Sequence, residues 1–249
     1  MILQLALAVI PAVLAITLHE AAHGYAALAL GDDTARKAGR LSLNPLVHVD
    51  RVGTILLPGF LLISQLLTIG RVAFMFGWAK PVPVAAWKFA NPRRGMMVVA
   101  AAGPAMNFFL AWAAAAIALL FVGNAAVATN GMLVPVFFGR DPVTAQGIAL
   151  AVVGYFIVYN LVLGLFNLLP IPPLDGGRIA VGLLPEAAAR VWARTERRGI
   201  LVVLMVVVIM PAVLGEAGIR VDPVRDALDS VLPRAVFFVL RMAGYGAGA

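Results

Sequence analysis

Residues 17–27 read TLHEAAHGYAA and end an otherwise apolar stretch that begins MILQLALAVIPAVLAI. The whole stretch is long enough to cross a bilayer as a helix, which takes about 20 apolar residues. Each ionisable side chain near the centre of a membrane costs about 2.5–3.5 kcal/mol on insertion scales, and such side chains usually have a function. The two histidines and the glutamate therefore direct the search for a site to this helix.

The composition of the whole chain is that of an integral membrane protein. Of its 249 residues, 62% are hydrophobic and 12% are charged, and the mean hydropathy is +0.97. Soluble globular proteins have far more charged residues. The net charge of +7 does not indicate nucleic-acid binding, because the Lys and Arg residues lie between apolar runs and form no basic stripe. The absence of cysteine excludes disulfides, thiolate metal sites and cysteine nucleophiles.

We therefore expect an all-α polytopic membrane protein with about four to six transmembrane helices. Four apolar runs are long enough, or nearly so, to cross roughly 30 Å of hydrocarbon. They are residues 2–30, 96–123, 147–169 and 199–215. We expect residues 1–215 to form one membrane domain and residues 216–249 to form a tail. The tail contains a short apolar run with Arg234 and Arg241, which favours an interfacial or membrane-docked helix.

A fifth apolar run, GTILLPGFLLISQLLTIG at residues 53–70, decides the topology. If it crosses the membrane once, the linkers at 31–52 and 71–95 lie on opposite sides, although both are rich in Lys and Arg. That arrangement violates the tendency of cations to collect on the cytoplasmic side.

A region 53–90 that dips into the membrane and returns gives a regular charge pattern. The linkers at 31–95 and 170–198 then lie in the cytoplasm with 14 cations, and the linker at 124–146 lies outside with Arg140 alone. Irregular backbone at membrane depth is tolerated only where protein or water surrounds it. The re-entrant region is therefore expected to line an internal site.

The HEAAH motif at residues 19–23 matches the H-E-x-x-H pattern of zinc enzymes. His19 and His23 lie four residues apart on a helix and so point to one face. Two neutral imidazoles can bind zinc, and the Glu20 carboxylate can take a proton from water whose pKa the metal lowers. The alternative, a chance match on an ordinary helix, has to place three ionisable groups in a membrane without a function.

A catalytic zinc needs a third protein ligand beside the two histidines. His48 and Asp50 are candidates, and Asp175 in NLLPIPPLDGG is the stronger one. Prolines end the preceding helix and glycines follow Asp175, so we expect it on an extended segment just past an apolar span. A helix-capping Asp in a proline-rich turn is the alternative. The re-entrant topology favours Asp175, because His19, His23 and Asp175 then all lie near the cytoplasmic ends of their helices.

These motifs resemble those of the site-2 proteases, which are intramembrane zinc metalloproteases. The resemblance rests on HEAAH, on G-P-x-x-N in AAGPAMNFF (Gly103, Pro104, Asn107), and on NLLPIPPLDGG with Asn167 eight residues before Asp175. The segment GRLSLNPLVHVD at 39–50 also resembles compact members of the family. The linker at 124–146 is too short for the PDZ domain of some relatives, and Arg51 stands where a proline is expected.

The resemblance implies that His19, His23 and Asp175 bind one zinc ion per chain and that Glu20 is the general base. It also implies that Asn167 helps to hold the substrate or the developing oxyanion. Strand-like backbone within 53–90 is expected to pair with an unwound substrate. Asn107 and His48 are candidate substrate contacts, with helix packing and a hydrogen bond within the loop as their respective alternatives.

The expected partners are the lipid bilayer and a transmembrane protein substrate, in which the enzyme cleaves a peptide bond within or near a membrane segment. We expect a multi-pass protein of the cell membrane with its site towards the cytoplasm. A metal-ion transporter is the alternative function, although a transporter has no need of Glu20 between the histidines. A serine protease is disfavoured because Ser42, Ser64 and Ser230 do not lie in a G-x-S-x-G motif.

Overall fold

The computed structural model describes residues 2–70, 77–122, 144–195, 199, 201, 203, 205–216 and 222–245. The regular elements within these residues are helices, and η denotes a short 3-10 or π helix. In chain order they are α1 (Ile2–Ala29), α2 (Thr34–Lys37), η1 (Pro45–His48), η2 (Arg51–Leu56), α3 (Leu57–Ile69), η3 (Ala86–Lys88), α4 (Pro92–Val122), α6 (Ala145–Asn167), α7 (Asp175–Leu183), α8 (Glu186–Arg194), η5 (Met205–Ile209), α10 (Met210–Glu216) and α11 (Pro223–Ala243).

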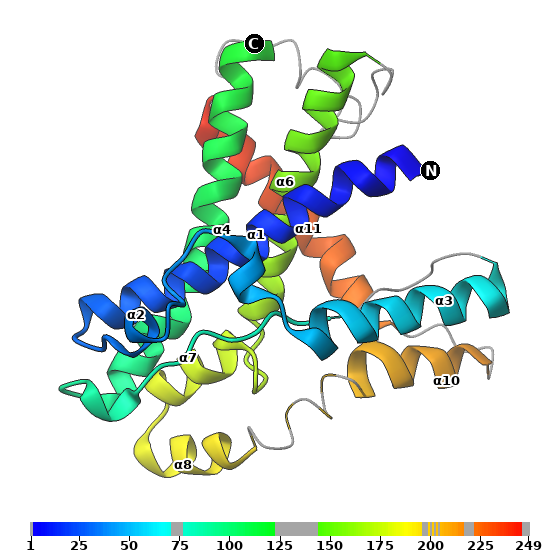
Figure 1. The fold of residues 1–249 in the computed structure, drawn as a ribbon. Helices are drawn as coiled ribbons and strands as arrows, with labels where there is room; N and C mark the ends of the chain where they lie inside the picture. Colours follow the sequence, from blue (N-terminus) through cyan, green and yellow to red (C-terminus); the bar gives the residue numbers. More distant parts are fainter. Residues whose placement is uncertain are drawn as a thin grey trace.

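Three long helices, α1, α4 and α6, pack against one another at the centre of the molecule. α4 and α6 run side by side and α1 crosses them obliquely (Figure 1). α7 packs on α4 and α8, and α11 packs on α4 and α6. Pro11 in α1 and Pro104 in α4 are both fully buried. Prolines inside membrane helices are tolerated where neighbouring helices surround the freed backbone groups.

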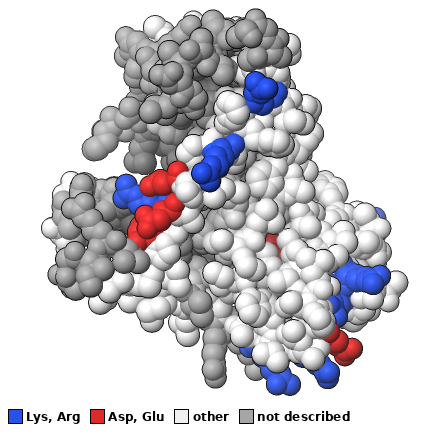
Figure 2. All heavy atoms as spheres, turned by 180° about the vertical axis from the view of Figure 1, so that it is seen from behind, with Lys and Arg blue, Asp and Glu red and all other residues white. Residues whose placement is uncertain are grey.

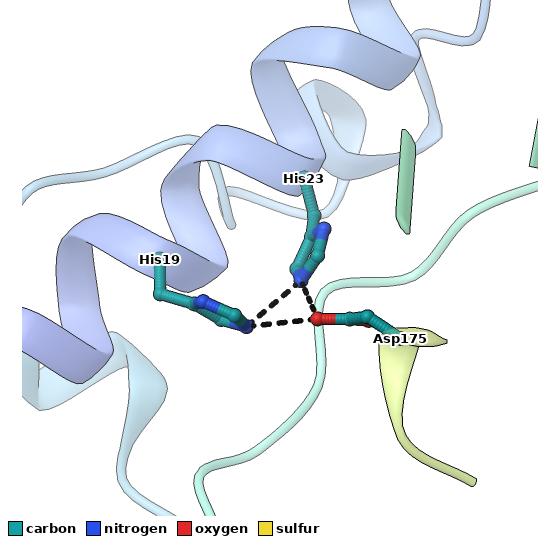
Figure 3. A group of neighbouring side chains, drawn as sticks. All are labelled: His19, His23 and Asp175. Atoms are coloured by element: carbon teal, nitrogen blue, oxygen red, sulfur yellow. Dashed lines mark hydrogen bonds and ion pairs between the residues drawn. The ribbon is translucent and has the colours of Figure 1, made fainter. Parts of the chain in front are cut away.

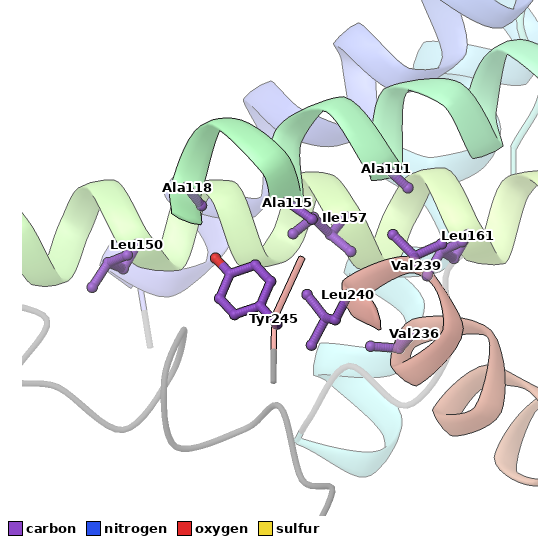
Figure 4. Packing of buried hydrophobic residues seen from close by; sticks show 10 residues of the cluster. All are labelled: Ala111, Ala115, Ala118, Leu150, Ile157, Leu161, Val236, Val239, Leu240 and Tyr245. Atoms are coloured by element: carbon purple, nitrogen blue, oxygen red, sulfur yellow. The ribbon is translucent and has the colours of Figure 1, made fainter. Parts of the chain in front are cut away.

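An apolar core joins α4, α6 and α11 (Figure 4). α4 contributes small side chains, Ala111, Ala115 and Ala118, which allow the helices to approach closely. α6 and α11 fill the remaining space with larger apolar side chains. These are Leu150, Ile157 and Leu161 from α6, and Val236, Val239 and Leu240 from α11, with Tyr245 just beyond. The tail therefore contributes to the helical core, and its place at the membrane interface stays a prediction.

Four helices in the described part of the chain are long and apolar enough to cross a membrane. They are Leu7–Ala29, Arg51–Thr68, Pro92–Phe121 and Gln146–Asn167. Three of them coincide with predicted spans, which confirms an all-helical membrane protein. The predicted span 199–215 lies partly outside the described residues, and its described part includes η5 and α10.

The strand-like backbone expected within 53–90 is not found in the residues described there. Residues 51–69 are helical instead, because Pro58 lies in the first turn of α3, where its missing N–H costs no hydrogen bond. Gly70 ends the helix with a positive φ of 68°. Residues 77–85 follow no regular helix or strand pattern.

The chain nevertheless returns to the point from which this helical excursion starts. The Trp78 N–H donates to the Gly53 carbonyl over 3.1 Å, and the Thr54 hydroxyl donates to the Trp78 carbonyl over 2.9 Å. The Lys80 N–H donates to the His48 carbonyl over 2.9 Å. Both ends of the excursion therefore lie together, as a re-entrant segment requires.

Large apolar side chains cover much of the outer surface. Leu67 of α3 is 81% exposed, and Leu120 and Phe121 of α4 are 83% and 81% exposed. Charged side chains are few on the face shown in Figure 2, where most of the described surface is white. Exposed apolar surface on this scale marks contact with a membrane or another protein.

Candidate metal centre

The two histidines of HEAAH lie one helical turn apart on α1, and their rings point to one place (Figure 3). Their Nε2 atoms are 3.1 Å apart, and the ring planes meet at 88°. His19 is buried and His23 is nearly so. The predicted arrangement of His19 and His23 on one helix face is present.

Asp175 completes the cluster from the start of α7 (Figure 3). Its Oδ2 lies 3.2 Å from His19 Nε2 and 3.3 Å from His23 Nε2. Leu174, the residue before it, is extended, and α7 begins at Asp175 itself. The prediction that Asp175 lies on an extended segment is therefore wrong by one residue. Gly176 is required at this turn, because a Cβ there would lie 2.3 Å from the Leu168 and Leu169 carbonyl oxygens.

Hydrogen bonds to the other ring nitrogens fix where each histidine carries its proton. His19 Nδ1 lies 2.6 Å from the Asn107 side-chain oxygen, and His23 Nδ1 lies 2.7 Å from the Val99 carbonyl oxygen. Both partners accept, so in a neutral ring Nδ1 carries the hydrogen and Nε2 has a free lone pair. Two lone pairs and one carboxylate oxygen thus converge with no hydrogen between them, and Asp175 Oδ2 is buried without a hydrogen-bond donor.

These two nitrogen lone pairs and the carboxylate oxygen repel one another unless a cation lies between them. Two imidazole nitrogens and a carboxylate oxygen are the donor set of many catalytic zinc sites. The ligand atoms of His19, His23 and Asp175 all lie within 4.8 Å of one another. The residues present therefore fit a zinc ion, which these three side chains would hold.

Two buried amides support His19 from behind. Asn107 on α4 accepts from His19 Nδ1 and donates through Nδ2 to the Asn160 side-chain oxygen over 2.8 Å. Asn160 on α6 donates in turn to the Phe156 carbonyl over 2.8 Å. Each amide therefore has one orientation, and the pair fixes the tautomer and direction of His19. Both amides are fully buried.

Gly103 makes room for the two histidines. A Cβ at this position would lie 2.5 Å from the Cε1 atoms of His19 and His23 and 2.6 Å from His23 Nε2. Such contacts are far shorter than van der Waals separation, so a larger residue would displace both ligands. The glycine of the G-P-x-x-N signature is thus explained by the site.

Glu20 lies beside the cluster and lines the same cavity, whose volume is about 450 Å³. Its Oε2 accepts a hydrogen bond of 3.1 Å from the Val82 N–H. The rest of the cavity wall is mostly apolar and comes from four parts of the chain. The lining residues besides the cluster and Glu20 are Trp78, Ala79, Pro81, Val82, Val84, Val99, Ala100, Asn167, Pro173, Leu174 and Arg178.

Comparison with known proteins identifies the family to which this arrangement belongs. The model of "Peptidase family M50" matches residues 7–211. The chain belongs to peptidase family M50. The match includes all three candidate ligands and Glu20, and it confirms the resemblance to the site-2 proteases.

Two curated M50-type relatives carry zinc metalloprotease names. One is "Putative zinc metalloprotease YwhC" of Bacillus subtilis (strain 168), 38% identical over 201 residues that cover 80% of this chain and 79% of the relative. The other is "Putative zinc metalloprotease Rip2" of Mycolicibacterium smegmatis (strain ATCC 700084 / mc(2)155), 32% identical over 203 residues that cover 80% of this chain and 65% of the relative. No solved structure matches the chain. The M50 membership and these relatives identify a zinc metalloprotease of the membrane.

The other predicted site residues of this M50 protein differ in whether they line the cavity. Asn167, the last residue of α6, lines the cavity, and its Nδ2 donates to the Leu163 carbonyl over 3.0 Å. His48 is buried outside the cavity lining, and its Nε2 bonds to the Ser42 carbonyl over 2.9 Å. Asn107 is also outside the lining and contacts His19. The His48 contact is the hydrogen bond within its loop that was the alternative, whereas Asn107 bonds to a candidate zinc ligand. Substrate contact by either residue stays a prediction.

Two residues of the M50 site were missed by the sequence analysis. Asn160 is one of two amides within the apolar span 147–169, the other being Asn167, and a polar residue inside a membrane span is a usable signal. The Val82 N–H carries no side-chain signal, and only the prolines on either side of it distinguish its position.

Proposed function

We propose that this M50 zinc metalloprotease cleaves a peptide bond within or near the transmembrane segment of another membrane protein. The observation that carries the proposal is a buried two-histidine, one-carboxylate cluster with Glu20 beside it, on helices able to cross a membrane. An apolar cavity wall suits an apolar substrate segment and keeps bulk water away from the reacting bond.

Zinc, when bound by His19, His23 and Asp175, would polarise the substrate carbonyl and acidify water. Glu20 has one carboxylate oxygen engaged by the Val82 N–H, and its Oε1 takes the proton of the attacking water. As the peptide bond breaks, the same oxygen delivers that proton to the departing amine. The water oxygen ends in the new carboxyl group, and the second proton of the water passes from this group to the amine. The products are therefore a carboxylate and an ammonium group, and atoms and charge balance.

In this proposal Asn167 stabilises negative charge on the carbonyl oxygen. Its amide has two N–H groups, and one of them bonds to the Leu163 carbonyl. The second N–H can donate to the oxyanion from the cavity wall. Asn167→Ala should therefore lower turnover without removing zinc.

The topology proposed for this function places the site towards the cytoplasm. The hydrogen bonds that join residues 48–54 to 78–80 support a re-entrant excursion. The chain has no cysteine, so single cysteines can report each side. Cysteines at the exposed positions Lys37, Lys88 and Arg194 should react with impermeant reagent from the cytoplasmic side, and one at Arg140 from the other side. Reaction at Lys88 only from outside would refute the re-entrant topology.

The test of the chemistry is Glu20→Gln. The neutral amide cannot take the proton, so cleavage of a model transmembrane substrate should fall by about 10²-fold to 10⁴-fold while zinc stays bound. Glu186→Gln on α8, the same chemical change away from the cluster, is the matched control and should cleave at the parental rate. Cleavage by Glu20→Gln at the parental rate would overturn the mechanism. Metal transport by purified parent without any proteolysis would favour the transporter instead.

A further inference from the structure

Residues 77–85, here called the strap, have no regular secondary structure and form part of the wall of the cavity that contains the metal cluster. The strap is held through its backbone N–H groups. Trp78 donates to the Gly53 carbonyl and Lys80 to the His48 carbonyl, and Val82 donates to Glu20 Oε2 over 3.1 Å. The third bond differs from the others because its acceptor is the carboxylate of the proposed base.

The sequence around this third bond leaves no competing donor. Pro81 and Pro83 flank Val82, and proline has no backbone N–H. The Val82 N–H is therefore the one amide hydrogen between residues 81 and 83. Because proline also fixes φ near −65°, the two rings stiffen the backbone that carries this hydrogen.

The far end of the strap is tied to a second carboxylate. Asp32 is fully buried, and its Oδ2 accepts from the Ala85 N–H over 2.6 Å. Its Oδ1 accepts from the Thr34 N–H and hydroxyl and lies 3.1 Å from Lys88 Nζ. Burial raises the pKa of Asp32, but the hydrogen bonds from Thr34, Ala85 and Lys88 outweigh it and lower the pKa to about 2. The anchor therefore stays charged at neutral pH.

A second anchor holds the strap just before Val82. The buried Arg40 guanidinium donates to the carbonyl groups of Lys80 and Pro81. It also donates to the Val47 carbonyl, which ties the loop before η2 to the strap. The strap is thus fixed on both sides of Val82.

We propose that the Val82 N–H is a positioning group for Glu20, and that Asp32 anchors the strap that delivers it. A glutamate side chain has several rotatable bonds, and ordering it in a cavity costs conformational entropy. A hydrogen bond to Oε2 selects one orientation of the carboxylate and directs Oε1 to the attacking water. This inference rests on the proposed function of Glu20 as the base.

The direct test compares Val82→Pro with Val82→Ala. Both lose the valine side chain, and only the proline variant loses the N–H. We expect single-turnover cleavage of a model transmembrane substrate to be roughly 10-fold to 100-fold slower in Val82→Pro than in Val82→Ala, as for a misplaced catalytic group. Zinc content and substrate affinity should be equal in the two variants. Equal cleavage rates would overturn the proposal.

A double-variant cycle separates positioning from a general structural role. The shorter side chain of Glu20→Asp cannot keep the same contact, so adding Val82→Pro to it should slow cleavage by less than about 2-fold. Asp32→Ala should slow the parent but add little to Val82→Pro, because both act through the same bond. An equal further loss in both backgrounds would show that the strap acts by structure alone.

If Val82→Pro does not fold, an amide-to-ester replacement at residue 82 removes the same hydrogen without a new ring and gives the same comparison. Failure of the proposed function is distinguishable, because it would appear as cleavage by Glu20→Gln. Loss of cleavage in Glu20→Gln together with equal rates in Val82→Pro and Val82→Ala would reject only the positioning role.

Discussion

Along the α4–α6 pair, a polar core and an apolar core lie next to each other. Asn107 and Asn160 are fully buried and hydrogen-bond to each other, Asn107 also bonds to His19, and Asn160 also donates to the Phe156 carbonyl. Ala111 lies one helical turn after Asn107, and Leu161 directly follows Asn160. Both are equally buried and belong to the apolar core. Burial alone therefore does not distinguish the residues that support the metal site from those of the apolar core. The two cores differ in their contacts: hydrogen bonds with defined partners join the polar core, whereas apolar packing alone joins the other.

This comparison predicts different failures for the two cores. Damage to the polar core should remove zinc while the helices stay assembled. Damage to the apolar core should lower the stability of the helices while the folded fraction still binds zinc.

The largest effect is expected from Gly103→Ala. The added Cβ would overlap both histidine rings, so both ligands must move, and zinc affinity should fall by at least the roughly 100-fold upper limit seen on loss of a residue that orients one metal ligand. Zinc affinity is measured by competition with a chromophoric chelator. Gly59→Ala in α3, where a Cβ meets nothing within 4 Å, is the matched control and should bind zinc like the parent. Parental zinc affinity in Gly103→Ala would contradict the account of this glycine.

A smaller and more selective effect is expected from Asn107→Ala. Removal of the partner of His19 should weaken zinc binding by about 10-fold to 100-fold, as for other residues that orient a metal ligand. Leu161→Ala should instead lower the free energy of unfolding by roughly 2–5 kcal/mol and leave zinc affinity unchanged. Zinc titration and thermal unfolding in detergent measure the two quantities. If both variants change both quantities alike, the two cores are not distinct.

The sequence predicted most of the site because the chemistry of zinc restricts the choice of residues. The spacing on a helix predicted His19 and His23. The proline- and glycine-rich segment after an apolar span made Asp175 the stronger third candidate, and the cation count supported this choice. The hydrogen bond from Asn107 to Asn160 depends on how α4 and α6 pack, and no local sequence pattern specifies that packing. The Glu20–Val82 bond uses a backbone group that every non-proline residue has.

The fold was predicted less well where proline position matters. The sequence predicts irregular, strand-like backbone within 53–90, whereas residues 57–69 form a helix with Pro58 in its first turn, a position that tolerates proline. The return of the chain to residues 48–54 depends on hydrogen bonds between distant segments. Cation counting predicted that return, and it gave no information on the structure of the segment between its ends.

The central claim is that His19, His23 and Asp175 together bind zinc, and metal content tests it most directly. Purified parent protein should hold about one zinc per chain, and Asp175→Ala should lose it, because three protein ligands are the usual minimum at a catalytic site. Glu20→Gln, which changes a neighbour of the ligands, should keep its zinc. Full zinc occupancy in Asp175→Ala would contradict the claim.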